Sequence, residues 1–251
     1  MLLLSIGMPR AGSGWYYQLQ HDLMLVNGGK EARSIRHRYH LERILTEVNC
    51  NIGALTPWRL IPVLLPSLLG SSYVIKAHAA PTPIAKWMIH KGWLKATYIY
   101  RDPRDAMLSA YENGQRALQN GRKNAFSQLT SFEKSLSFME DYVRIANAWL
   151  ACTNILHTRY EDLLTQYDEE TKRLLHFLQI FPTAQALQII KRYQPQEAQH
   201  ATQAGLHFRK GKMRRFLQAY NPEQQAQCWQ KFAPFLQQQG YSEREDELEN
   251  E

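Results

Sequence analysis

The chain has 251 residues, 44% of them hydrophobic, and a formal net charge of +7 at pH 7. A chain of this length and composition can bury one substantial core, so we expect a single α/β domain. Its three cysteines, Cys50, Cys152 and Cys228, show no CxxC spacing, which argues against a disulfide framework and a structural zinc site. This cysteine usage is typical of a reducing compartment, and we predict a cytoplasmic protein.

Two apolar runs are candidates for a targeting or membrane segment. The run at residues 1–6 is far shorter than a signal-peptide core and leads into a Pro-Arg-Ala-Gly turn, so it predicts a buried strand. The run Leu60–Leu69 is interrupted by Pro62 and Pro66 and has about half of the ~20 residues that a spanning helix needs. We therefore expect no membrane insertion.

The positive charge lies in the body of the chain. The last ten residues, SEREDELENE, hold six acids and one arginine, so they carry −5 and leave +12 on the other 241 residues. Such an excess suits nucleic acid, an acidic membrane surface or a polyanionic small ligand, and composition does not choose among them. We predict a folded domain over residues 1–240 and an acidic, disordered tail over residues 241–251.

Short apolar stretches alternate with longer helical patterns along the chain. The predicted strands are Leu2–Ile6, Tyr73–Ile75, Ala96–Tyr100 and Asn154–His157. The predicted helices lie near residues 13–27, 82–91, 103–119, 131–150 and 184–193. This alternation predicts a central parallel sheet flanked by helices. Ligands of such sheets bind outside the carboxyl ends of the strands, so the residues directly after each strand are the candidates for a site.

A glycine-rich loop follows the first predicted strand and reads Gly7-Met8-Pro9-Arg10-Ala11-Gly12-Ser13-Gly14-Trp15. Glycines let backbone amides approach an anion, a helix N-terminus adds partial positive charge, and Arg10 adds a planar cation suited to phosphate or sulfate. The Walker pattern is absent because Ser13 and Gly14 follow Gly12 without a lysine. The loop predicts a bound phosphate-type group; the alternative is an ordinary turn with a solvent-facing Arg10.

Lys76 and His78 follow the strand Tyr73–Ile75. A neutral histidine, with a reference pKa near ~6.5, can take a proton from a reacting group near pH 7, so His78 is the candidate general base. Lys76 is a candidate for stabilising negative charge during group transfer. A structural role is the alternative for His78, and other candidate bases are His37, His40 and His90. No metal-binding constellation is evident, and we expect no metal requirement.

Two further segments gather cations. Arg101 follows the strand Ala96–Tyr100, and Ser109 lies about 10 Å along the next helix, so the two could converge on one anion. The alternative is a capped amphipathic helix with solvated arginines. Residues 207–215 place five Lys or Arg residues around Gly211, which suits closure over a polyanion. A solvated basic loop or a nucleic-acid patch is the alternative there.

Taken together, these segments resemble the family of PAPS-dependent sulfotransferases, where PAPS is 3′-phosphoadenosine 5′-phosphosulfate. PRAGSGW at residues 9–15 is similar to the family's phosphosulfate loop, and YIYRDPRDAMLSAY at residues 98–111 is similar to its 3′-phosphate motif. The segments at residues 76–78, 158–163 and 209–211 resemble the family's Lys-Thr-His, Tyr-Glu-Asp-Leu and Arg-Lys-Gly segments. The likeness runs from about residue 3 to 216, and its five short motifs occur in the family's order.

The resemblance implies a P-loop NTPase-like sulfotransferase fold and a defined set of site residues. By this likeness His78 would be the base, Lys76 would hold the sulfuryl oxygens, and Arg10 would neutralise charge on the leaving phosphate. Trp15 would stack on the adenine ring. The PAPS-binding residues would be Pro9, Arg10, Ala11, Gly12, Ser13, Gly14, Trp15, Arg101, Ser109, Tyr160, Arg209, Lys210 and Gly211.

Two positions depart from the family's pattern. Gly14 replaces the usual threonine and so removes a hydroxyl contact, and Arg214-Arg215-Phe216-Leu217 stands where the family has Gly-Asp-Trp-Lys. We predict transfer of a sulfuryl group to a hydroxyl or amine of a small acceptor, such as a metabolite, sugar or lipid headgroup. Residues 33–43 and 58–69 are expected to border the acceptor site. The alternatives are a P-loop kinase and a basic nucleic-acid-binding protein, although we expect no nucleic acid as partner.

Overall fold

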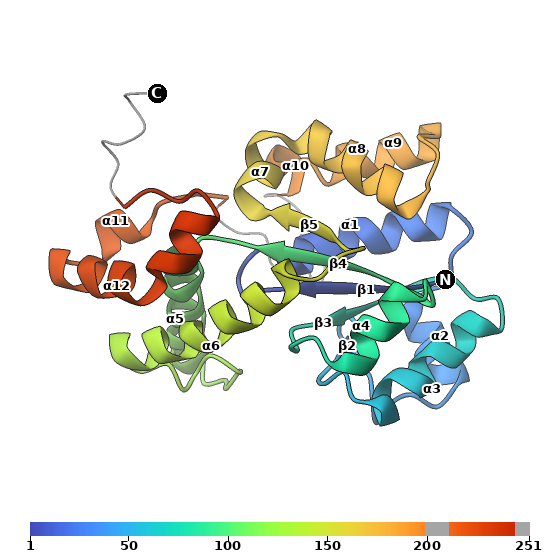
Figure 1. Cartoon of the computed structure of the whole chain (residues 1–251), viewed down its shortest axis with the longest axis horizontal. Coiled ribbons are helices and arrows are strands. Elements are labelled where there is room, and N and C mark those ends of the chain that lie inside the picture. The colour runs from blue at the N-terminus through green and yellow to red at the C-terminus, as the bar shows by residue number, and fades with distance from the viewer. Residues whose placement is uncertain (199–210, 244–251) are drawn as a thin grey trace.

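Five parallel strands form the sheet in the part of the chain that the computed structural model describes, residues 1–198 and 211–243 (Figure 1). Their order is β2-β3-β1-β4-β5, so the first strand lies at the centre. All four strand pairs are parallel, which confirms the predicted α/β architecture. The strands are β1 (Leu2–Gly7), β2 (Asn51–Ile52), β3 (Tyr73–Ala77), β4 (Leu94–Tyr100) and β5 (Leu156–Arg159).

Helices cover both faces of the sheet (Figure 1). One face carries α1 (Ser13–Val26), α7 (Tyr160–Thr165), α8 (Tyr167–Leu178), α9 (Ala184–Arg192) and α10 (Pro195–Ala198). The other face carries α2 (Ala32–Arg38), α3 (Pro57–Leu68), α4 (Pro83–His90) and α6 (Phe132–Leu150). Beyond the carboxyl ends of the strands lie α5 (Pro103–Gln119), α11 (Phe216–Ala219) and α12 (Pro222–Gln238).

The inner strands β1 and β3 are buried on both faces, and the side chains of β1 alternate between two cores. In β1, Leu2, Leu4 and Ile6 belong to the core that contains residues of α2, α3, α4 and α6. Leu3 belongs to the opposite core, with residues of α1, α8 and α9. Successive strand side chains point to opposite faces, so a strand buried on both sides reads as a continuous apolar run.

The four strands and five helices predicted from the sequence are present, and their ends lie within two residues of the predicted ones. β2 has two residues, which is too short to leave a periodic signal in the sequence. The apolar run Leu60–Leu69 forms most of α3, with Pro62 and Pro66 inside the helix. None of the helices in residues 1–198 and 211–243 is both long and apolar enough to cross a membrane.

The packed chain extends past residue 240, where the predicted domain ends. Tyr241 is buried, and its hydroxyl donates a hydrogen bond to Glu161 (3.0 Å). The carbonyl oxygens of Ser242 and Glu243 accept hydrogen bonds from Arg104 at 2.8 and 3.4 Å. Residues 241–243 therefore belong to the domain, and the rest of the predicted tail, residues 244–251, lies outside the described residues.

Candidate active site

The backbone holds the loop between β1 and α1 against the sheet. The amide of Met8 donates to the carbonyl of Ile99 on β4 (2.9 Å). Arg10 and Gly12 have φ angles of +66° and +75°, a conformation that favours glycine. A Cβ atom on Gly12 would lie 2.7 Å from the ring of Tyr160. Glycine at this position is therefore required both by the turn and by the packing of α7.

The amino end of α1 opens toward a cavity. Gly12 is the N-cap residue, and no side chain caps this helix. Ser13 and Gly14 line the cavity at the first turn. The first amides of an α-helix have no partner within the helix, and the helix dipole gives that end partial positive charge. An anion bound at this point would accept hydrogen bonds from these amides.

Arg101 lies directly after β4 and is 5% exposed. Its Nη2 donates to Asp105 Oδ2 and to the carbonyl of Lys212, both at 2.8 Å, and its Nη1 donates to the carbonyl of Arg10 (3.4 Å). The guanidinium lies 4.5 Å from the centre of the Tyr160 ring. Burial lowers the pKa of Arg101, but Asp105 and Tyr160 outweigh burial, so the pKa is raised. The buried Nε has no hydrogen-bond partner among the described residues.

Arg10 reaches from the loop to α5. Its Nε donates to Ser109 Oγ (3.1 Å), and its guanidinium lies 5.8 Å from the centre of the Phe126 ring. Ser109 lies two turns into α5, where its hydroxyl joins Arg10 at the cavity. The loop after β1 and the helix after β4 therefore converge, as expected for the edge of a parallel sheet.

The end of β3 lies beside the same loop. Nδ1 of His78 is 2.6 Å from the carbonyl oxygen of Gly7. Because a carbonyl oxygen only accepts, Nδ1 carries the proton and Nε2 of the neutral ring carries none. Burial and the Lys76 charge lower the pKa of His78 to about 4. Burial and the Arg10 charge lower the pKa of Lys76 to about 8. At pH 7 a neutral histidine thus lies beside a charged lysine.

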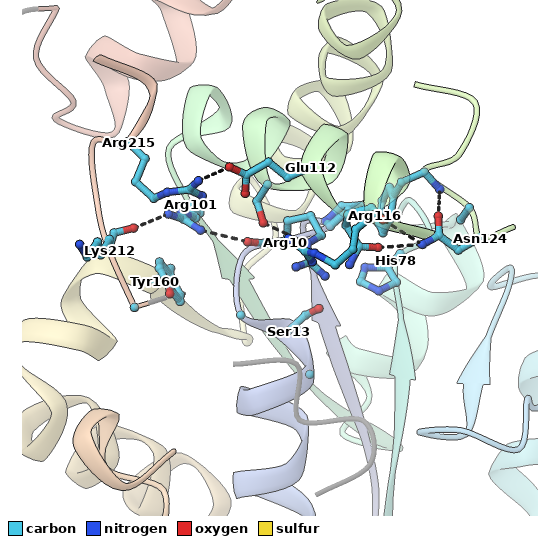
Figure 2. Close-up of a pocket in the computed structure, with 18 of the residues that line it drawn as sticks. Arg10, Ser13, His78, Arg101, Glu112, Arg116, Asn124, Tyr160, Lys212 and Arg215 are labelled. Carbon is cyan, nitrogen blue, oxygen red and sulfur yellow. Dashed lines mark hydrogen bonds and ion pairs between the residues drawn. The ribbon is translucent and has the colours of Figure 1, made fainter. Parts of the chain in front are cut away.

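These side chains line one cavity of about 360 Å³ (Figure 2), within the ~300–1,000 Å³ range of small-molecule sites. Glu112 is the one acidic residue among the described residues of its lining, and it forms an ion pair with Arg215. Six lining residues are cationic: Arg10, Lys76, Arg101, Arg116, Lys212 and Arg215. This charge suits a ligand that carries several negative charges.

Helix α5 contributes more residues to the cavity than we predicted. Ser109, Glu112, Asn113 and Arg116 all line it. Their spacing of three, four and seven residues places them on one helix face. This spacing is visible in the sequence. Counted from Ser109, it could have identified Glu112, Asn113 and Arg116 as residues of the same site.

The connection between α5 and α6 forms another wall, with Asn124, Ala125 and Phe126. Its approach to α5 depends on Gly114, because a Cβ atom there would lie 2.1 Å from the carbonyl oxygen of Phe126. The side-chain amide of Asn124 also donates to Asn113 Oδ1 (2.8 Å). No local sequence pattern marks this connection as part of a site.

Most of the predicted site residues come together around this cavity. Those that line it are Pro9, Arg10, Gly12, Ser13, Gly14, Lys76, His78, Arg101, Ser109, Tyr160 and Gly211. Ala11 and Trp15 are fully buried and lie outside the lining. Arg209 and Lys210 lie outside the described residues. None of the alternative bases, His37, His40 and His90, lines the cavity.

Trp15 packs in the core against α8. Its ring stacks on Tyr167 with centroids 6.0 Å apart, and its Nε1 donates to the carbonyl of Tyr193 (2.9 Å). Tyr160 approaches the same indole edge-on at 6.4 Å and also lines the cavity. Stacking of Trp15 on an adenine ring stays a prediction.

Comparison with known proteins identifies the family to which this chain is similar. The family model of the sulfotransferase domain matches residues 3–233. Mouse sulfotransferase SULT7A1, solved in complex with PAP, is 14% identical with a TM-score of 0.59, over 94% of this chain and 84% of that one. Retinol dehydratase, solved with androsterone and the inactive cofactor PAP, is 19% identical with a TM-score of 0.58, over 94% and 80% of the two chains.

No curated protein matches the chain. At 14% and 19% identity, the solved structures establish a shared fold. The family model spans nearly the whole chain and both cavity-lining loops that follow β1 and β4. The predicted family, fold and enzyme class are confirmed: the chain belongs to the sulfotransferase-domain family.

Proposed function

We propose that this sulfotransferase uses PAPS as its donor and transfers the sulfuryl group to a hydroxyl or amine of a small acceptor. One observation carries the proposal: two separate cationic features share a single cavity. The first is the uncapped amino end of α1 with Arg10, and the second is buried Arg101 with Lys212. PAPS carries a 5′-phosphosulfate and a 3′-phosphate, so it presents two anionic groups to such a site.

The residues present fit this donor at both ends. Ser13 and Gly14 at the first turn of α1 suit the 5′ group, because their helix end is uncapped by any side chain. Ser109 and Arg101 suit the 3′-phosphate, and Arg101 has a buried Nε without a partner among the described residues. Two structural neighbours were solved with PAP, which is the product that PAPS leaves after transfer.

Residues of this chain accept the proton that the acceptor releases and stabilise the negative charge that develops during transfer. Bound PAPS supplies the sulfuryl group, whose bond to the 5′-phosphate breaks as the acceptor atom bonds to sulfur. Nε2 of His78 accepts the proton of the acceptor hydroxyl or amine, while the Nδ1 contact to Gly7 holds the ring in the required tautomer. Lys76 and Arg10 keep positive charge beside His78, where it stabilises negative charge that builds up on transfer.

The acceptor end of the cavity is formed by α5 and the connection to α6. Residues 33–43 and 58–69, which were expected to border the acceptor site, do not line this cavity. In Figure 2, Arg116 and Asn124 lie near His78, at the opposite end of the cavity from Tyr160 and Lys212. Phe126 adds an aromatic ring to this end. An acceptor with an apolar part and a polar or anionic substituent fits these three side chains.

The first test is calorimetric titration with PAP, ADP and ATP in the absence of metal. We expect PAP to bind at least about tenfold more tightly than ADP, because only PAP carries the 3′-phosphate that charged hydrogen bonds would hold. Tighter binding of ATP, or no binding of any nucleotide, would contradict the proposal and favour a kinase or a nucleic-acid-binding protein.

A matched pair of variants makes this test specific. Ser109→Ala should weaken PAP binding about tenfold and leave ADP binding nearly unchanged, because Ser109 is assigned to the 3′-phosphate. Ser137→Ala, at an exposed position of α6, is the control and should change neither affinity. Equal weakening of PAP and ADP in Ser109→Ala would remove Ser109 from the 3′-phosphate site.

A further inference from the structure

Helix α3 carries an apolar face that the rest of the described chain leaves uncovered. The exposed side chains of this face are large and hydrophobic, and 49% to 87% of the surface of each residue is exposed. They are Trp58, Ile61, Leu65, Leu68 and the C-cap residue Leu69. At about 100° per residue, these positions fall within a ~120° arc of the helix surface. They form one continuous stripe, which we call the α3 face.

The opposite side of α3 fixes the helix to the domain. Leu60, Val63 and Leu64 are buried in the core beneath the sheet. Figure 1 shows α3 at the outside of the molecule, with α2, on the face of the sheet away from α1. A helix that is apolar all round is normally buried, so the exposure of the α3 face calls for a partner.

The chain segment that carries α3 and α4 contains lysines and no carboxylate. Between Glu47 and Asp102 the sequence contains no Asp or Glu. Thr82, the N-cap residue of α4, donates its hydroxyl to the carbonyl of Leu55 just before α3 (2.6 Å), so the two helices start side by side. Lys86 on α4 and Lys91 at its end are exposed.

Helix α4 adds exposed aromatic rings to the same region. Trp87 and the nearby Trp93 are both partly exposed and pack edge to face, with centroids 4.7 Å apart. Tryptophan and lysine are the residues that favour the boundary between water and lipid, because each has an apolar body and a polar end. Trp58 at the start of α3 belongs to the same class.

We propose that the α3 face docks the enzyme onto an anionic lipid surface. At about 1.5 Å per residue, the 12 residues of α3 extend about 18 Å, well short of the ~30 Å of a bilayer core. The helix therefore lies in the plane of the headgroups, with the α3 face among the acyl chains and the α4 lysines on the phosphates. The absence of carboxylates from residue 48 to 101 favours lipid over a protein partner with a mixed polar rim. This docking does not depend on the sulfuryl-transfer proposal.

The test is co-sedimentation of the full chain with vesicles of phosphatidylcholine, with and without phosphatidylglycerol. We expect binding to the phosphatidylglycerol vesicles that weakens at high salt. Ile61→Ser combined with Leu65→Ser should weaken binding by about tenfold or more, because two apolar side chains lose their burial in lipid. Lys86→Gln and Lys91→Gln should each weaken it about fivefold.

The matched control carries two exposed apolar side chains elsewhere. Phe181 precedes α9 and Leu187 lies in it, on the opposite face of the sheet. The double variant Phe181→Ser with Leu187→Ser should bind vesicles like the unmodified chain. All substituted apolar residues are exposed, so melting temperatures should stay unchanged and report intact folds. No binding to anionic vesicles, or equal loss in both double variants, would overturn the proposal. A dimer in sedimentation velocity would also overturn the proposal if the double variant Ile61→Ser with Leu65→Ser dissociated it. In that case the α3 face would bind a second copy of the chain.

Discussion

Lys76 and His78 owe their protonation states to their place at the end of β3. Burial and the Lys76 charge lower the pKa of His78, and burial and the Arg10 charge lower the pKa of Lys76. Each cation makes the next one harder to protonate, which keeps a neutral imidazole inside a positively charged cavity. The sequence placed both side chains after a strand, whereas their pKa shifts depend on contacts with the loop after β1.

His78→Ala should lower kcat by about 10²- to 10⁴-fold, because the acceptor loses the base that takes its proton. PAP affinity should stay within about twofold, since His78 makes no contact assigned to the nucleotide. His90→Ala, at an exposed position of α4, is the control and should leave turnover unchanged. Unchanged turnover in His78→Ala would remove His78 from the proposed mechanism. Single-turnover kinetics at saturating PAPS measures the effect.

The rate should respond to pH through Lys76. A lysine is charged below its pKa, so a pKa of about 8 means that the charge is lost as pH rises through 8. His78, with a pKa of about 4, stays neutral from pH 5 upward and adds no acid limb in that range. We expect kcat/KM to be flat between pH 5 and 7 and to fall above pH 8. Lys76→Arg should move the fall to higher pH; an unmoved fall would exclude Lys76 as its origin.

Helix α5 organises the cavity because one of its faces carries ligand-directed side chains and the positions beside that face are buried. Ser109, Glu112 and Arg116 line the cavity, while Ala106, Met107 and Ala110 are buried in the protein. This division follows from the helical period, so the sequence contained it. The connection to α6 packs against α5 at the acceptor end, and no helical period in the sequence predicts this contact.

Gly114→Ala tests how this connection is held. A methyl group at Gly114 would meet the Phe126 carbonyl at 2.1 Å, so the backbone near Phe126 must move. We expect a loss of about 1–3 kcal/mol in the free energy of unfolding, despite the higher helix propensity of alanine. The KM for the acceptor should rise severalfold while PAP affinity is kept, because Phe126 lies at the acceptor end. Thermal denaturation and steady-state kinetics measure the two effects.

Gly53→Ala is the matched control for that substitution. Its added methyl group would meet only the end of the flexible Arg59 side chain, at 3.3 Å. Both the melting temperature and the acceptor KM should stay close to those of the unmodified chain. A Gly114→Ala variant that behaves like this control would show that the connection tolerates displacement.

At the scale of the whole molecule, the C-terminal segment closes the cavity edge of the sheet. The carbonyl of Lys212 accepts a hydrogen bond from Arg101, and Tyr241 donates to Glu161 after β5. Arg104 links these parts, because it pairs with Asp102 at 2.8 Å and donates to the carbonyl of Ser242 at 2.8 Å. Residues more than a hundred positions apart thus share one buried polar network.

Arg104→Met should destabilise the fold by about 3–5 kcal/mol, because buried Asp102 would lose its charged partner. The lost cation also lies 4.1 Å from the centre of the Phe216 ring at the start of α11. Arg144→Met removes a surface pair with Asp141 and should change stability by less than about 1 kcal/mol. Urea denaturation of both variants measures the difference, and equal midpoints would contradict the role of Arg104.

The sequence by itself determined the local units of this protein. Continuous apolar runs predicted β1 and β4. The glycine-rich loop, with Arg10 and a helix N-terminus behind it, predicted an anion site. The spacing from Arg101 to Ser109 allowed the two residues to converge on one anion, and both line the cavity. These features depend on residues within about ten positions of one another, where helical and strand periods can be read directly.

Only the tertiary structure decided how these units meet. The two-residue strand β2 and the Asn124–Phe126 wall arise from contacts between distant segments, which leave no periodic signal. The stacking of Trp15 on Tyr167 also joins residues that lie far apart in the sequence. The same apolar sequence in α3 fits a buried helix or an exposed face, and the packing of the neighbouring helices made one side of it a surface. Sequence sets which side chains are apolar or charged; the arrangement of the elements sets which of them reach the cavity, the core or the solvent.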